Sequence, residues 1–489
     1  MTTPTESAPW LRRNASAIAA SSVGVVATVF AITFGTLGLR HFWRFHVHVF
    51  DVGIFAQGTW LLSRLKWPFF VTIRGLPLFA DHSSYILVLI APIYWLFPSP
   101  ATLIVIGVIA LAITGPLAFL VARRAGAGLV LSTATGVLVL FQPALQWQVR
   151  DSFHPEILVI PLVVAAIALL QKDRDGWAVV AFVIALTAKE DVGLLIAPLG
   201  LVIWWVMGKK RTGLSVAGLG VGAFLLNFLV LLPAWSPSGE LLYSYRYAAL
   251  GEGPLGIVAG LLTKPDVWIE VWSDPLRLGY VAALLLALPL ALLSPRWLLV
   301  GVPTLLANVF TNHGYQYDVR YHYTAYLIAV VVVAACFGAA RVQRSSVKNA
   351  VWIALAVMIV SGFTTWFAVA PVRETWAPPH EHQDQIREIL DQIPDDAAVS
   401  AWTTFGAHLT EREFVYLFPN PFSEHYYATP GPYGTNGGDI PDPALLDYVF
   451  VRTDSYSLHD ALIAELWTSD DWAVEVNDPP FLLLRSVDR

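Results

Sequence analysis

The sequence predicts an α-helical polytopic membrane protein with about 11 to 13 spans, followed by a C-terminal soluble α/β domain. Two observations point to the membrane. Of the 489 residues, 56% are hydrophobic and only 13% are charged, whereas soluble globular chains carry roughly 25% charged residues. Apolar runs of nearly bilayer-spanning length also recur from about residue 17 to residue 370.

The third observation is a split in charge. Residues 371–489 contain 21 acidic and six basic residues, while residues 1–370 contain 15 acidic and 24 basic ones. We therefore expect a membrane domain over residues 1–370 and an acidic extracytoplasmic domain over residues 371–489. The single cysteine, Cys336, excludes an intrachain disulfide. The first apolar stretch runs to Leu39 without a small-residue cleavage site, which indicates a retained helix.

The loops between the apolar segments alternate in character. One set is short and basic and is therefore predicted to be cytoplasmic, together with the N-terminus. The other set is long, aromatic and rich in histidine, and is predicted to be extracytoplasmic: residues 40–82, 143–156, 189–191, 234–277, 312–323 and the C-terminal domain. The apolar segments themselves are residues 17–39, 101–122, 128–142, 157–171, 177–188, 192–207, 213–233, 278–293, 297–311, 324–340 and 350–370.

This alternation requires that Ser83–Phe97 does not cross the bilayer. The segment SSYILVLIAPIYWLF is short and contains an internal proline, so we interpret it as interfacial or re-entrant. Eleven crossings then remain, and all 12 histidines fall on the outer face.

Polar residues in the outer loops are the candidate functional residues. Asp51 follows the first apolar helix in the motif FDVGIFAQGTW. A carboxylate near the membrane surface is costly unless it is paired, hydrated or functional, although a helix cap is an equally good explanation. Asp81 and His82 open the interfacial segment, where the alternative is again a polar helix start.

Two further clusters lie directly before apolar segments. The motif QVRDSFHPE contains Asp151, His154 and Glu156, for which a self-paired salt-bridge cluster is the competing interpretation. The motif AKEDVG places Lys189, Glu190 and Asp191 in sequence between two apolar runs. Because little room remains there for solvation, we favour a water-filled cavity.

The last cluster is NHGYQYDVRYHYTAY, which contains Arg320, Tyr321 and His322. An aromatic belt at the interface explains the tyrosines but not the basic residues on the outer face. A cation beside a wall of tyrosines suits a phosphate group with an attached apolar or sugar moiety.

Several function classes lack support in the sequence. The glycines of GLGVGA lie within an apolar segment and indicate close helix packing. There is no phosphate-loop, dinucleotide-binding or HExxH motif, and no stretch typical of nucleic-acid binding. No cofactor is assigned, and a divalent metal stays an open alternative because no ligand spacing identifies its site.

The C-terminal domain alternates helical and strand patterns. We expect helices over residues 383–393 and 460–467, and strands over residues 397–402, 413–418, 447–454, 472–476 and 481–486. Residues 418–443 are rich in glycine, proline and aromatics and predict a long loop. Such a loop could close over the outer opening of a cavity or take no part in catalysis.

The motifs together resemble a known family. FDVGIFAQGTW, DHSSYILVLIAPIYWLFPSP, DSFHPEILVIPL, AKEDVGLL, SPRWLLVGVPTLLAN and YDVRYHYTAY occur in this order between about Leu39 and Ala340. They resemble the predicted bacterial and archaeal membrane proteins called domain of unknown function 2079, which are similar in layout to the GT-C superfamily of membrane glycosyltransferases. The resemblance implies an acidic residue in the first outer loop, as Asp51 is, and a sugar donor on a polyprenyl-phosphate carrier. An acidic DxD or ExD motif in the second outer loop is missing; Asp151 and Glu156 are nearest to it.

The sequence and this resemblance predict a membrane glycosyltransferase that transfers a sugar from a polyprenyl-phosphate carrier to an extracytoplasmic glycan, lipid or protein. Asp51 would be the general base, and Arg320, His322 and Lys189 would stabilise the departing lipid phosphate. Glu190 and Asp191 would position the sugar or orient Lys189, and His82 and His154 would hold the phosphate or a metal. The alternative is a transporter or flippase of lipid-linked sugars, but the internal repeats common in transporters are missing from the sequence.

Overall fold

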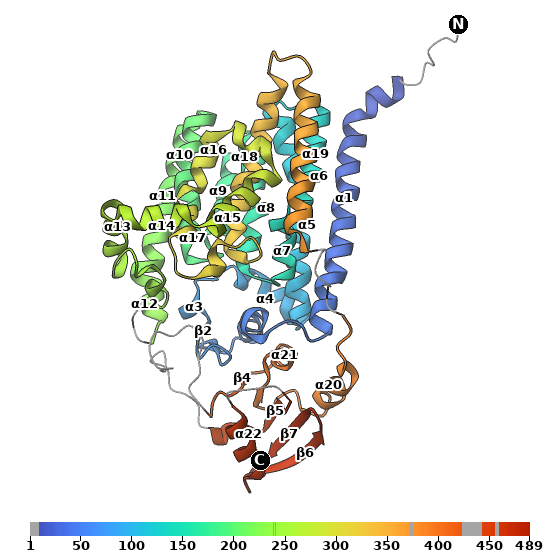
Figure 1. The fold of residues 1–489 in the computed structure, drawn as a ribbon, viewed down its shortest axis with the longest axis vertical. Helices are drawn as coiled ribbons and strands as arrows, with labels where there is room; N and C mark the ends of the chain where they lie inside the picture. The colour runs from blue at the N-terminus through green and yellow to red at the C-terminus, as the bar shows by residue number, and fades with distance from the viewer. Residues whose placement is uncertain are drawn as a thin grey trace.

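The chain folds into a helical membrane domain with a small α/β domain at one end (Figure 1). The computed structural model describes residues 9–237, 239, 241–371, 376, 378–422, 443–454 and 459–489, and the side chains of residues 9–13 and of Asp51 lie outside this description. Most of the long glycine- and proline-rich loop expected in the C-terminal domain, residues 423–442, also lies outside it.

Seven helical segments of the described chain are long and apolar enough to cross a membrane. They are built from α1 (Pro9–Trp43), α5 (Pro100–Ala125), α6 (Leu129–Leu140) with α7 (Pro143–Arg150), α10 (Gly193–Met207), α11 (Lys210–Leu226) with α12 (Leu232–Trp235), α18 (Ala325–Gln343) and α19 (Ala350–Val369). The other expected segments are also helical but shorter: α8 (Val159–Leu170), α9 (Asp175–Leu186), α15 (Pro275–Ala287), and α16 (Pro295–Leu298) with α17 (Val302–Val309).

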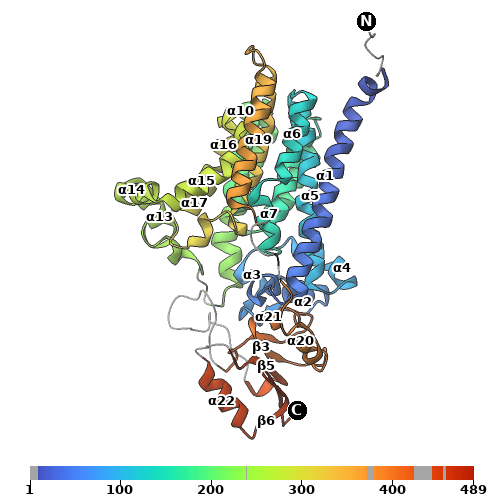
Figure 2. The same ribbon diagram turned by 45° about the vertical axis from the view of Figure 1, so that its right-hand side comes forward.

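The basic loops meet at one end of the helical bundle, as their alternation predicts. Arg344 donates a hydrogen bond to the carbonyl of Ala125 at 3.1 Å, and Arg124 donates to that of Ala168 at 2.7 Å. The Lys209 ammonium lies 2.7 Å from the Asp173 carboxylate. The opposite end carries the C-terminal domain and the short helices α2 (Ile54–Ser63), α3 (Leu78–Asp81) and α4 (Leu87–Leu96) (Figures 1 and 2).

The segment between α1 and α5 begins and ends on the same side, as expected for an interfacial Ser83–Phe97. Its helix α4 has only 10 residues, about half of what a span needs. Trp43 at the end of α1 and Pro100 at the start of α5 line one cavity of about 800 Å³. A short two-stranded hairpin, β1 (Phe70–Val71) and β2 (Leu76–Pro77), lies within the same segment.

Helices α10 and α11 pack backbone to backbone. A Cβ atom on Gly200 would lie 2.3 Å from the Ala217 nitrogen, and one on Gly220 would lie 2.4 Å from the Ala197 nitrogen. The close packing expected for the GLGVGA motif is therefore confirmed at Gly220, which permits van der Waals contact between the two helices. Two further short helices, α13 (Gly253–Thr263) and α14 (Pro265–Ser273), precede α15.

The C-terminal domain is a five-stranded sheet in the order β4-β3-β5-β7-β6. Strands β4, β3 and β5 are parallel, and β7 and β6 are antiparallel additions. The elements are α20 (Gln383–Leu390), β3 (Val399–Ala401), α21 (Thr403–Gly406), β4 (Val415–Leu417), β5 (Tyr448–Arg452), α22 (Asp460–Thr468), β6 (Trp472–Asp478) and β7 (Phe481–Ser486). Each expected helix and strand is present.

The two faces of this sheet have different partners because side chains alternate along a strand. Val449 and Leu482 pack in a cluster with α22. Phe450 and Leu483 instead join the large core that continues into the membrane domain. One face of the sheet is thus covered by α22, and the other packs on Phe405 of α21, which joins this face to the core of the membrane domain.

Hydrogen bonds connect the edge strand β4 and the residues before it to the segment between α1 and α5. The Thr72 hydroxyl donates to the carbonyl of Val415 at 2.6 Å and accepts from its N–H at 3.0 Å. The Gln57 amide donates to the carbonyl of Glu413 at 3.0 Å. These bonds occupy backbone groups that an edge strand would otherwise leave unpaired.

At the contact between the C-terminal domain and α4, the carboxyl group of Glu411 has a raised pKa. Burial raises the pKa of Glu411 to about 7, and the Tyr94 hydroxyl of α4 donates to this carboxylate at 3.3 Å. A carboxyl group whose pKa is higher in the folded than in the unfolded state stabilises the fold fully below its ordinary pKa of 4.5. This contribution is lost as the pH rises through about 7.

We therefore expect Glu411→Gln to raise the thermal unfolding midpoint of the detergent-solubilised protein relative to wild type, increasingly so from about pH 5 to pH 8. Glu413→Gln is the matched control, because Glu413 is exposed and pairs with Lys66 at the rim of the same cavity. A constant difference between Glu411→Gln and wild type across this range would contradict the assignment.

Candidate functional site

A buried polar network lies where the helices end on the side of the C-terminal domain. Its residues come from the turn after α3, the turn between α7 and α8, the turn between α9 and α10, and the start of α18. Eight of the expected site residues belong to it: His82, Asp151, His154, Glu156, Lys189, Glu190, Asp191 and His322. Residues separated by up to 240 positions therefore converge, because the helices on this side of the bundle end close to one another.

Lys189 and Glu156 form a buried ion pair in this network. The ammonium lies 2.6 Å from the carboxylate, and the two side chains are 6% and 4% exposed. Burial alone would lower the pKa of Lys189, but the charge of Glu156, followed by those of Asp191 and Glu190, raises it above its usual range. Lys189 is therefore a fixed cation, and it lies 5.3 Å from the centre of the Tyr323 ring.

The two acidic residues after Lys189 have different partners. Glu190 accepts from the His82 ring nitrogen Nδ1 at 2.9 Å and from the backbone N–H of Ser83 at 3.1 Å. Asp191 accepts from the Tyr326 hydroxyl at 2.7 Å. The KED motif thus links three separate elements and is not a solvated loop.

Asp151 faces two histidines. Its Oδ2 atom lies 3.0 Å from His322 Nδ1 and 3.8 Å from His154 Nδ1, and it accepts from the backbone N–H of His322 at 2.7 Å. The two imidazole rings are stacked with centroids 3.7 Å apart and an interplanar angle of 14°. Ser152, at φ +72°, makes the tight turn that brings Asp151 and His154 together.

The structure adds residues that the sequence reasoning did not select. Arg74 is 1% exposed and pairs with Asp81 at 3.1 Å, and the Tyr243 hydroxyl donates to the same carboxylate. Burial alone would raise the pKa of Asp81, but Arg74, His82 and Tyr243 lower it to about 2. The Tyr243 ring stacks on His82 with centroids 5.3 Å apart, which joins this group to the network.

Arg246 is the second addition. It is 8% exposed, lies 4.3 Å from the centre of the Tyr243 ring, and is 3.4 Å from the Tyr323 hydroxyl. Within the described chain it has no carboxylate partner, and its Nε has no hydrogen-bond acceptor. The criterion that singled out Arg320, a cation among tyrosines on the outer face, applies equally to LLYSYRYAAL and could have identified Arg246.

Arg320 and Tyr321 do not join the network. Arg320 is half exposed and forms a bidentate pair with Asp318, with distances of 2.9 and 2.7 Å to the carboxylate. The Tyr321 ring packs on Tyr315 with centroids 4.5 Å apart. The structure thus places His322 in the site and its two preceding neighbours on the surface side.

Asp51 lies in a π-helical turn, Val49–Gly53, directly before α2. The residues around it contact the network from two sides. The Arg74 guanidinium lies 5.9 Å from the centre of the Phe50 ring, and Phe55 packs edge-on against His154 with centroids 5.5 Å apart. The backbone of Asp51 therefore borders the site expected from the sequence.

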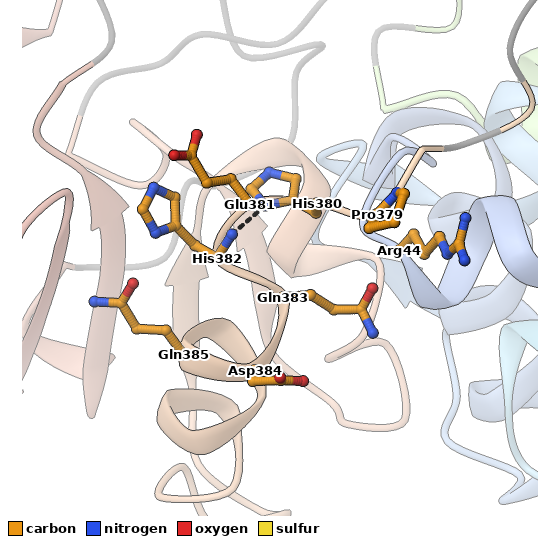
Figure 3. Close-up of a pocket in the computed structure, with 8 residues that line it drawn as sticks. All are labelled: Arg44, Pro379, His380, Glu381, His382, Gln383, Asp384 and Gln385. Carbon is orange, nitrogen blue, oxygen red and sulfur yellow. Dashed lines mark hydrogen bonds between the residues drawn. The ribbon is translucent and has the colours of Figure 1, made fainter.

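A separate cavity of about 380 Å³ lies where the C-terminal domain meets the end of α1. It is lined by Arg44 and by Pro379–Gln385 (Figure 3). The backbone N–H of His382 donates to His380 Nδ1 at 3.2 Å, while Glu381 and Asp384 point in different directions (Figure 3). Because its acidic side chains diverge, this cavity lacks the convergence of polar atoms seen in the buried network.

Comparisons with known proteins agree with this architecture. The model of a family described as "Predicted membrane protein (DUF2079)" matches residues 41–430. Two crystal structures of ArnT from Cupriavidus metallidurans are similar in fold. The complex with undecaprenyl phosphate has a TM-score of 0.53 at 12% identity, over 94% of this chain and 97% of that chain. The apo state has a TM-score of 0.51 at 13% identity, over 95% and 98%. No curated protein matches the chain.

Proposed function

Because this chain belongs to the DUF2079 family of predicted membrane proteins and has the fold of ArnT, a GT-C glycosyltransferase, we propose that it is a membrane glycosyltransferase. It takes a sugar from a polyprenyl-phosphate carrier and transfers it to an acceptor on the extracytoplasmic side. The ligand of the ArnT complex, undecaprenyl phosphate, is the lipid that such a reaction would release.

Arg246 is the observation that carries this proposal. A buried guanidinium stays charged, and burying a charge is costly unless an opposite charge accompanies it. Arg246 has no carboxylate partner in the described chain, and it shares the Tyr323 ring with Lys189. Burial lowers the pKa of His313 to about 4, and the charge of Arg246 contributes to this shift. A phosphate bound beside these two cations would supply the missing negative charge.

In the proposed reaction, each bond that forms or breaks has a residue that accepts the proton or stabilises the charge. The acceptor hydroxyl attacks the anomeric carbon of the donor sugar, and the bond from this carbon to the phosphate oxygen breaks. Asp51, at the border of the network, takes the proton of the hydroxyl. Arg246 and Lys189 stabilise the negative charge that develops on the departing lipid phosphate. Glu190 and Asp191 orient the sugar hydroxyls, and His82 contacts the phosphate.

The direct test uses the purified protein in liposomes with polyprenyl-phosphate donors that carry radiolabelled sugars, and with cell-envelope lipids and glycans as acceptors. The expected result is a labelled acceptor together with an equal amount of released polyprenyl phosphate. Movement of the intact donor between leaflets, without release of the carrier, would identify a flippase and reject the enzyme.

Arg246→Met is expected to lower the transfer rate by about 10²–10³-fold, the usual effect of removing one stabilising group for a developing charge. Stability should not fall, because the substitution removes a buried cation that has no carboxylate partner in the described chain. Arg320→Met is the matched control and should keep the wild-type rate, since Arg320 is half exposed and paired with Asp318. Equal losses in both variants would contradict a specific role for Arg246.

A further inference from the structure

Asp151 and His154, from the turn between α7 and α8, and His322, from the turn before α18, together have the composition and spacing of a metal site. One ligand atom from each residue lies within 4.8 Å of the other two. All three side chains are at least 87% buried. Two of the three contacts converge on one atom, Asp151 Oδ2, which both histidines face through Nδ1. We propose that these residues bind a divalent transition-metal ion of the zinc type.

The ligand chemistry selects this class of ion. Imidazole nitrogens with one carboxylate suit Zn²⁺ and its neighbours, whereas Mg²⁺ and Ca²⁺ prefer oxygen ligands. Three protein ligands leave one position of a tetrahedral ion open, as in catalytic zinc sites. The site therefore would present an exchangeable position to a water molecule or a substrate oxygen.

The surroundings supply the supporting contacts that such a site requires. The backbone N–H of His322 holds the Asp151 carboxylate in place at 2.7 Å. The other nitrogen of His322, Nε2, lies 3.9 Å from the Glu156 carboxylate. A carboxylate hydrogen-bonded to the second nitrogen orients a metal-bound histidine, so the ring movement on ion binding would have to shorten the distance from Nε2 to Glu156 to about 3 Å. Phe55 packs edge-on against His154 and shields it from solvent.

Ion binding requires a small rearrangement of the two rings. Ligand atoms about 2.0–2.2 Å from a tetrahedral ion lie roughly 3.3 Å apart, and the Asp151–His154 distance of 3.8 Å exceeds that. The rings are nearly parallel at 3.7 Å, so they must fan apart for both nitrogen lone pairs to point at one ion. Metal binding is therefore expected to change the environment of both imidazoles.

The test measures metal directly and does not depend on the transferase proposal. Protein purified with a tag that contains no histidine is stripped with a chelator, dialysed against zinc, and analysed by mass spectrometry for zinc per chain. We expect one zinc ion in wild type and background levels in Asp151→Asn, His154→Ala and His322→Ala. His313→Ala, which changes a histidine of the same outer side outside the triangle, should keep the ion.

Two further measurements guard against loss of fold. Zinc should raise the thermal unfolding midpoint of wild type and His313→Ala but not that of the three ligand variants. X-ray absorption at the zinc edge should show two imidazole nitrogens in wild type. Absence of zinc from wild type, or retention of one zinc by any of the three ligand variants, would overturn the proposal.

Discussion

Asp51→Asn is expected to lower the rate of sugar transfer by about 10²–10⁴-fold, the range that general acid–base catalysis contributes. Asparagine keeps the size of the side chain but cannot accept the proton of the attacking hydroxyl. The turn that carries Asp51 is fixed by Val49 and Val52, which are fully buried. The fold should therefore survive the substitution, and the loss should appear in turnover.

The measurement is the transfer assay on protein whose unfolding midpoint matches wild type. Asp266→Asn is the control, because Asp266 is an exposed carboxylate of the predicted outer loop 234–277 and should leave turnover unchanged. Full turnover in a properly folded Asp51→Asn protein would remove Asp51 from the mechanism and move the search for a base to the histidines of the network.

Lys189→Met is expected to destabilise the membrane domain by about 3–5 kcal/mol, because it leaves the buried Glu156 carboxylate without its cation. It should also abolish transfer, since Lys189 is one of the two cations that we propose to stabilise the departing phosphate. The double variant Lys189→Met/Glu156→Gln removes both charges and should recover most of the lost stability, as neutral replacements of buried ion pairs do.

Comparison of the single and the double variant distinguishes a structural role of Lys189 from a catalytic one. Denaturant unfolding in detergent gives the stability of each variant, and the transfer assay gives its activity. A double variant that is stable but inactive assigns Lys189 a chemical role. If the double variant regained activity along with stability, Lys189 would only neutralise Glu156.

The fold was largely predictable because a membrane-spanning helix and a buried strand each require an apolar run of a characteristic length. Apolar length and the sign of the loop charges located the helices, and the short apolar runs in DYVFVRTD and FLLLRS located β5 and β7. Span lengths were harder to predict. Helices α8, α9, α15 and α17 are shorter than a full span, and apolar composition alone does not show at which residue such a helix ends.

The site was predictable only in part. The clusters around Asp151, Lys189 and His322 could be identified because ionisable residues beside apolar runs are costly. Which charges pair could not be read from the sequence, since partners such as Lys189 and Glu156 come from different turns, 33 positions apart. Arg320 and Arg246 illustrate the difficulty. Both are arginines among tyrosines, and only the tertiary structure buries one and pairs the other with a neighbouring aspartate.

The bonds between Thr72, Gln57 and strand β4 have a mechanical consequence. They tie the last quarter of the chain to the segment that follows Asp51, through backbone groups that cannot rotate away as surface side chains can. The C-terminal domain and the segment between α1 and α5 are therefore expected to move as one unit. A displacement of the C-terminal domain would then also displace α2, whose Phe55 contacts His154.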